Sequence, residues 1–251
     1  MLKKTQEVSF ISFKRDKHDK KLRKSVFLKL NKMAHLFLTS NWFFLYDVIF
    51  ELFFAITALI VSVYSFKVYK LSNQNQPKLF GIAFLSFSIS YFIQSILNYL
   101  IISEKAQIIS NIGILNSLGL FSHIFFFIIG LTTLAYMVLK IRSKQTYILL
   151  LSSSLLSFLI IANKLYWFYA FSSLLLIFIS IYYFLNFTKN KKPKSFIIFL
   201  AFLFLLFGHI HFIFSVNHLL YYIIGHFLEL LAYILILINL TLVLKNGKKK
   251  K

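Results

Sequence analysis

The chain has 251 residues, of which 59% are hydrophobic and 14% are charged, and it contains no cysteine. Soluble globular domains average about 45–50% apolar and about 25% charged residues. This composition excludes a disordered tail, a disulfide scaffold and an ordinary water-soluble enzyme. The formal net charge of +21 comes from 28 Lys and Arg against 7 Asp and Glu.

A basic segment, residues 1–42, precedes the apolar part of the chain. Residues 1–32 carry 11 Lys and Arg and 3 Asp and Glu. Apolar side chains recur in this segment at spacings of 4, 4, 3 and 4 residues, at Leu22, Val26, Leu30, Met33 and Phe37. Such a stripe is typical of an amphipathic helix that lies on anionic lipid headgroups. Two alternatives stay open, a disordered basic tail and a translation start at Met33, which leaves a short N-terminus without Lys or Arg.

Seven stretches that are long enough for membrane-spanning helices follow this segment. A span needs roughly 20 apolar residues, and helices satisfy the backbone in lipid where strands in an open sheet do not. The predicted spans are Phe43–Phe66, Leu79–Ile102, Asn111–Leu139, Gln145–Ala162, Leu165–Phe187, Phe196–Val216 and Leu219–Leu244. The fourth is the shortest. The sequence therefore predicts an all-α bundle of seven transmembrane helices over residues 43–244, with a basic cytoplasmic tail at 245–251.

The basic residues between the predicted spans indicate how the bundle is oriented. Lys and Arg favour cytoplasmic loops, and the breaks after the seven spans hold 3, 1, 3, 1, 4, 0 and 5 of them. This alternation predicts that the C-terminus is inside and the N-terminus outside. The basic N-terminal segment is then either translocated to the outside regardless of its charge, or it lies on the cytoplasmic side. In the second case the number of spans differs by one.

Polar residues occur within the spans at a similar distance from the basic residue that marks the inner end of each span. Glu51 lies 16 residues before Lys67, and Gln94 lies 16 residues after Lys78. The same spacing of 15 to 17 residues separates five others from the basic residue at that end of their helix: His123, Ser172, His209, His211 and Glu229. Sixteen helical residues measure about 24 Å, so these groups share a plane in the outer third of a core of about 30 Å. Because a charge that faces lipid is costly, we expect an outward-opening polar pocket.

The candidate ligand- or ion-binding residues belong to this polar layer and are Asp47, Glu51, Gln94, His123, His226 and Glu229. Asp47 and Glu51 are four residues apart, and His226 and Glu229 are three apart, so each pair lines one side of its helix. His209 and His211 are about 200° apart around their helix, so at most one of them points into the bundle. Hydrogen bonding between helices, without any ligand, is the alternative interpretation of the layer.

A metal set within the same layer consists of His123, His211, His226 and Glu229. Imidazole and carboxylate ligands suit zinc, which activates water for hydrolysis, and His123 with His211 would suit a haem with two histidine ligands. Retinal is disfavoured, because its Schiff base needs a lysine on the last span and none lies between Leu219 and Leu244. The cofactor is left open by the sequence.

These features favour a membrane sensor or accessory subunit that binds a ligand or ion from the outside, rather than an enzyme. The alternatives are a metal-dependent membrane hydrolase and a purely structural membrane subunit. The inner halves of the spans hold almost no ionisable groups, which argues against a complete channel or pump. The expected partners are the lipid bilayer of the cell membrane, anionic headgroups at the basic segments and a membrane or cytoplasmic protein, but no nucleic acid.

Three stretches carry a resemblance to a loose group of small archaeal seven-helix membrane proteins to which no activity is assigned. They are VYKLS (Val68–Ser72), GIAFLSFSISYFIQSILN (Gly81–Asn98) and GHFLELLAYILIL (Gly225–Leu237). The resemblance covers about a third of the chain. It implies the seven-helix fold and an archaeal-type plasma membrane, and it implies no activity.

Overall fold

The computed structural model describes residues 41–102, 112–140, 143–160, 163–215 and 218–248. Within these ranges every regular element is an α-helix, which confirms the predicted fold class. The helices are α2 (Asn41–Ser72), α3 (Asn75–Ile102), α5 (Ile112–Val138), α6 (Lys144–Ile160), α7 (Lys164–Asn190), α8 (Pro193–Ser215) and α9 (Leu219–Lys248). Contacts divide the chain into residues 1–42 and Phe43–Lys251, and the second unit forms the helical bundle. The predicted basic segment up to residue 40 and residues 249–251 of the predicted tail lie outside the described residues.

Six of the described helices are long and apolar enough to cross a bilayer, namely α2, α3, α5, α7, α8 and α9. They coincide with six of the seven predicted spans, whereas α6 has 17 residues and is shorter than the roughly 20 that a span needs. Large apolar side chains face outward from the six long helices, among them Ile49, Phe92, Phe178 and Leu231. An apolar surface of this kind suits lipid rather than water. The chain is therefore a membrane protein.

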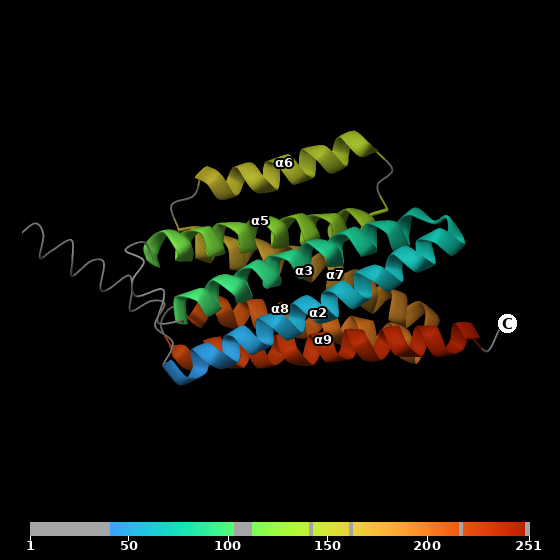
Figure 1. Cartoon of the computed structure of the whole chain (residues 1–251). Helices are drawn as coiled ribbons and strands as arrows, with labels where there is room; N and C mark the ends of the chain where they lie inside the picture. The colour runs from blue at the N-terminus through green and yellow to red at the C-terminus, as the bar shows by residue number, and fades with distance from the viewer. Residues whose placement is uncertain (1–40, 103–111, 141–142, 161–162, 216–217, 249–251) are drawn as a thin grey trace, which may run out of the picture. The chain divides into compact units, whose positions relative to one another are not determined.

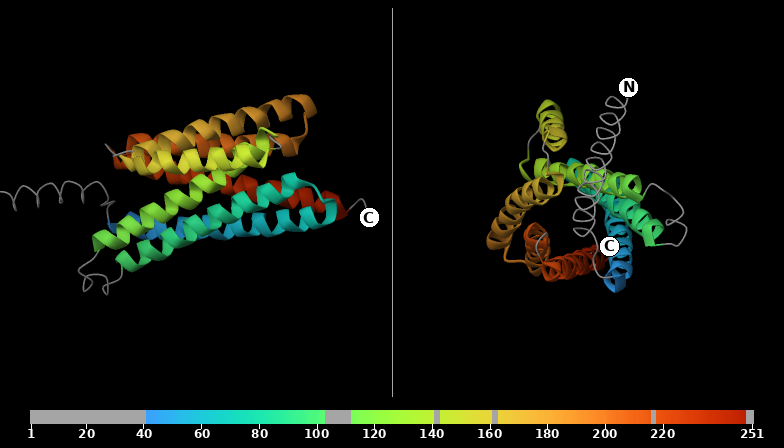
Figure 2. Two further views of the ribbon diagram at one scale, coloured as in Figure 1. Left: turned by 90° about the horizontal axis from the view of Figure 1, so that it is seen from above. Right: turned by 90° about the vertical axis from the view of Figure 1, so that its left-hand side faces the viewer.

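The helices form a bundle in which α5 and α7 run in the same direction (Figure 1). In the first halves of these helices, the ring centroids of His123 and Phe168 lie 5.8 Å apart. Near their ends, Met137 and Tyr182 line one cavity. Because α6 connects two parallel helices, it runs back along the length of the bundle, on its outside next to α5 (Figures 1 and 2). Helix α8 packs extensively against α9, and α3 packs extensively against α5.

Serine hydroxyls hold α2 against α3 through backbone carbonyls. Ser88 donates to the carbonyl of Ala55 at 2.8 Å, and Ser95 donates to the carbonyl of Val48 at 3.2 Å. In a membrane, small residues and hydrogen bonds of this type replace the hydrophobic effect as the source of helix association. They set the register of α2 against α3, and this register places Glu51 beside α3.

Aromatic side chains fill the middle of the bundle. The ring of Phe54 on α2 stacks on Tyr233 of α9 with centroids 4.9 Å apart, and it meets Tyr91 of α3 edge-on at 5.3 Å. All three rings are buried. Offset and edge-to-face contacts are the favourable geometries for such rings, so this layer forms a close-packed floor beneath the polar side chains of the bundle.

Lysines gather at one end of the bundle, which we call the basic end, at Lys67, Lys70, Lys78, Lys140, Lys144, Lys189, Lys191, Lys192 and Lys194. Helices α2, α5 and α7 end there in residues with left-handed backbone conformation, Asn73, Lys140 and Lys191. A cation at a helix C-terminus is favoured by the helix dipole. The acidic side chains of the described part, Asp47, Glu51 and Glu229, all lie toward the opposite end. Most lysines of the described helices and all three acids therefore lie toward opposite ends of the bundle, with Lys164 as a basic residue at the acidic end.

Candidate functional site

The site begins with two carboxylates one turn apart on α2. Asp47 Oδ1 lies 3.1 Å from Nε2 of His226 on α9. The hydroxyl of Tyr222, one turn before His226 on the same helix, donates a 2.7 Å hydrogen bond to the other oxygen of Asp47. Both the Asp47 and the His226 side chains are buried. One acid from α2 is thus bound by two side chains that the helical repeat of α9 brings to one face.

Glu229 joins the same network from α9. Its Oε2 lies 3.5 Å from Nδ1 of His226, and its Oε1 lies 3.9 Å from Nδ1 of His209 on α8. Tyr91 on α3 donates its hydroxyl to Oε1 at 3.3 Å. Nδ1 of His209 also lies 3.0 Å from the carbonyl of Leu205, and because a carbonyl only accepts, this nitrogen carries the proton. Side chains from α3, α8 and α9 therefore meet at one carboxylate.

Glu51 has a different set of contacts. The amide of Asn98 on α3 donates to both carboxylate oxygens of Glu51, at 2.9 and 3.0 Å. Gln94 in turn donates to the side-chain oxygen of Asn98 at 3.3 Å. Among the described residues, no basic side chain lies within ion-pair distance of Glu51. This buried carboxyl is held by a neutral amide.

We call this group the buried polar cluster, and its members are Asp47, Glu51, Tyr91, Asn98, His209, Tyr222, His226 and Glu229. Four helices, α2, α3, α8 and α9, contribute to it. Of the predicted site residues, Asp47, Glu51, His226 and Glu229 come together in the cluster, and Gln94 lies behind Asn98. Tyr91 and Asn98 were not among the predicted site residues. Their spacing of three and four residues around Gln94 on one face of α3 is the signal that could have found them.

Two predicted metal ligands lie elsewhere. The ring of His123 sits among Tyr91, Phe127 and Phe168, with its Nδ1 2.9 Å from the Ser90 hydroxyl. His211 is only partly buried. Its Nδ1 lies 2.7 Å from the Phe207 carbonyl, and its ring lies beside Tyr221. His209 and His211 lie on nearly opposite sides of α8, and His209 is the one that points into the bundle.

Within the described part of the chain, no group of three or more His, Asp or Glu side chains is arranged to hold a metal ion. The predicted set of His123, His211, His226 and Glu229 is split, because only His226 and Glu229 are neighbours. A haem bridging His123 and His211 has no support from their surroundings either, since the two rings contact different aromatic side chains. The carboxylate and imidazole groups of the buried polar cluster instead contact one another.

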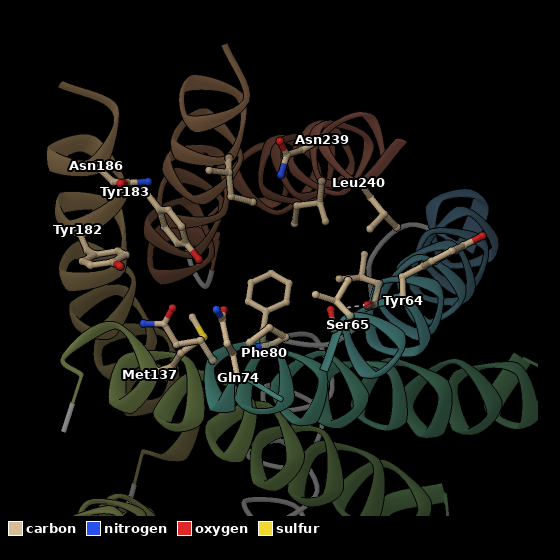
Figure 3. A pocket seen from close by; sticks show the side chains of 16 residues that line it. Tyr64, Ser65, Gln74, Phe80, Met137, Tyr182, Tyr183, Asn186, Asn239 and Leu240 are labelled. Atoms are coloured by element: carbon tan, nitrogen blue, oxygen red, sulfur yellow. Dashed lines mark hydrogen bonds between the residues drawn. The ribbon is translucent and has the colours of Figure 1, made fainter. Parts of the chain in front are cut away.

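A cavity of about 360 Å³ lies near the basic end, away from the buried polar cluster. The sequence predicted a pocket at the polar layer, where the structure has buried side chains in contact. The cavity is surrounded by side chains from α2, α3, α5, α7, α8 and α9, including Tyr183, Phe80 and Asn239 (Figure 3). It lies about 20 Å along α2 from Glu51, as the 13 residues between Glu51 and Tyr64 require.

The chain was compared with protein families, with curated proteins and with solved structures. No family model, no curated protein and no solved structure matches it.

Proposed function

We propose that this protein spans the membrane seven times, with its N-terminus outside and its C-terminus inside. In this topology α6 also crosses the membrane, in addition to the six long helices. The parallel course of α5 and α7 supports α6 as a crossing helix, because a chain that ends α5 at the basic end must return before α7 begins. The lysines of the basic end support the orientation, since basic residues favour the cytoplasmic side. On this topology the buried polar cluster lies in the outer part of the membrane.

Single cysteines flanking α6 test this topology, because the chain has no cysteine of its own. Ser143 and Asn163 are exposed and both cap the helix that follows, through bonds to the backbone N–H of Thr146 and Tyr166. We expect a membrane-impermeant maleimide added to intact cells to label Asn163→Cys and to leave Ser143→Cys unlabelled until the cells are broken. Equal labelling of both variants in intact cells would show that α6 does not cross.

We further propose that the buried polar cluster binds a proton or a cation as small as ammonium that enters from the outer side. The observation that carries this proposal is the meeting of three carboxyl groups, Asp47, Glu51 and Glu229, at one depth between helices that supply few positive groups. Glu51 in particular is buried against a neutral amide. Unpaired carboxylates inside a membrane are costly, and a bound cation removes this cost.

Binding at the buried polar cluster suits a sensor or an accessory subunit better than a transporter. Between the buried polar cluster and the basic end, the described spans carry no Asp, Glu, Lys, Arg or His side chain. A conduction path would need polar groups through the whole thickness. A change in occupancy of the cluster would reach the other side through α2 and α9, which both run on toward the basic end and a partner in the cytoplasm or membrane.

The variant Glu51→Gln tests cation binding at the buried polar cluster. A ligand that binds only the folded state raises stability with its concentration, so the melting temperature of the purified wild type is expected to rise saturably with protons or ammonium. Glu51→Gln keeps the shape of the side chain and should abolish this dependence. Ser62→Ala is the matched control, because it alters a buried polar residue of the same helix far from the cluster.

Choline chloride at equal ionic strength controls for screening. If no cation stabilises the wild type beyond choline, or if Glu51→Gln responds as the wild type does, the cluster does not bind a cation. Its hydrogen bonds then serve only to join helices, as in a structural subunit.

A further inference from the structure

The cavity at the basic end changes in character from its mouth to its floor. Gln74 and Gln76, in the connection between α2 and α3 and the first turn of α3, are exposed at the mouth. Val61, Ile198 and Ile236 are buried at the floor. The volume of about 360 Å³ falls within the range of about 300–1,000 Å³ that small-molecule pockets occupy. A molecule that fills this space must therefore have a polar head and an apolar body.

The amide side chain of Asn239 lies in the wall of the cavity. The side-chain oxygen of Asn239 on α9 is buried and accepts no hydrogen bond from the described residues. Asn239 lies one turn above Ile236, and Figure 3 shows its amide at the edge of the cavity. The amide nitrogen is the end of Asn239 drawn toward the cavity, so the group that it offers to a ligand is a hydrogen-bond donor.

The mouth of the cavity lies in a field of positive charge. Lys67, Lys78 and Lys189 each lie within three residues of a residue that lines it. The ammonium of Lys67 sits 5.1 Å from the ring centroid of Tyr64, which is itself part of the wall. No acidic side chain of the described residues lies at this end to neutralise these lysines. Because the lining itself carries no charged side chain, the attraction acts on a group at the mouth.

We infer that this cavity binds an anionic amphiphile, with its hydrocarbon chain on the apolar floor and its phosphate or carboxylate headgroup among the lysines of the basic end. The carboxamides of Gln74, Asn186 and Asn239 would bind polar atoms near the head. Such a molecule reaches the site either as a lipid of the adjacent leaflet or as a soluble amphiphile. This site is separate from the buried polar cluster, so Glu51→Gln is expected to leave it unchanged.

Binding is measured with the full-length protein in nanodiscs of phosphatidylcholine, using dodecyl phosphate as the probe and dodecyltrimethylammonium as a cation with the same chain. We expect saturable binding of one dodecyl phosphate per protein and no specific binding of the cation. Lys67→Gln, a surface change, should weaken binding about fivefold, since one basic residue near a membrane surface contributes about 1 kcal/mol to the binding of an anionic group.

Leu240→Trp fills the cavity from α9 and should abolish binding, whereas Leu237→Trp, on the same helix but outside the lining, should not. Equal affinities for the anion and the cation, or equal binding by both tryptophan variants and by Lys67→Gln, would overturn the inference. Adding phosphatidylglycerol to the nanodiscs then separates the two sources. Competition with the probe identifies a bilayer lipid as the occupant, and undiminished probe binding identifies a soluble amphiphile.

Discussion

His226→Leu is expected to lower the free energy of unfolding by about 3 kcal/mol, the largest effect of a single change at the buried polar cluster. His226 stands between two acids, 3.1 Å from Asp47 and 3.5 Å from Glu229. Leucine preserves the bulk but removes both contacts, which leaves two buried carboxyl groups close together. The measurement is unfolding of the purified protein in mixed micelles with increasing SDS.

A double-mutant cycle separates this contact from the loss of packing. Asp47→Leu alone should also be strongly destabilising, because it leaves His226 without its nearest acid. The loss of unfolding free energy in the double variant Asp47→Leu/His226→Leu should be smaller than the sum of the losses in the two single variants, by about 1–3 kcal/mol. Replacing both members of a buried pair by apolar groups leaves neither of them unpaired. Strict additivity would mean that the two side chains do not interact, despite their 3.1 Å separation.

Gly225→Ala is expected to lower the free energy of unfolding by about 1–3 kcal/mol, although alanine is the better helix former. A Cβ at Gly225 would lie 2.5 Å from a carbon of the Phe212 ring. That ring is buried and contacts Tyr169 and His226, so it has little freedom to move. A Cβ at Gly208 would in turn lie 3.1 Å from the backbone carbonyl oxygen of Gly225, so α8 and α9 approach closely at this pair of glycines.

Gly81→Ala is the matched control for Gly225→Ala. Its Cβ would lie 3.2 Å from the ring of Phe66, which is only partly buried and can shift. We expect Gly81→Ala to be neutral or to stabilise by up to about 1 kcal/mol through helix propensity. If Gly225→Ala proves as stable as Gly81→Ala in the same SDS titration, then α8 and α9 do not need a glycine to pack.

The apolar helices could be predicted because span length and composition are local properties. Runs such as Leu79–Ile102 and Leu219–Leu244 are too long and too apolar for anything but membrane helices. The fourth predicted span, Gln145–Ala162, is the marginal case, because the helix α6 has 17 residues where a span needs roughly 20. Its position between the parallel helices α5 and α7 adds support for a crossing, and that position depends on packing between distant segments.

The candidate site was predictable in part for a related reason. Depth along a helix follows from residue number, so Asp47, Glu51 and Glu229 could be assigned to a common layer. Rotation of each helix about its axis could not be read in this way. The inward histidine of α8 is His209 rather than His211, and His123 turns toward Ser90 and aromatic rings. A side chain's neighbours are set by how helices face one another.

The sequence by itself determined that this is an all-helical membrane protein with its positive charge toward one end and its few acids buried, because hydropathy and charge act locally. The tertiary structure alone decided which of these polar groups meet and where a cavity opens. The glycine contact between Gly208 and Gly225 and the serine bonds of α2 and α3 set helix rotation and spacing. They join the acids into a closed cluster and leave the open space at the lysine-rich end, since contacts between helices depend on residues far apart in the chain.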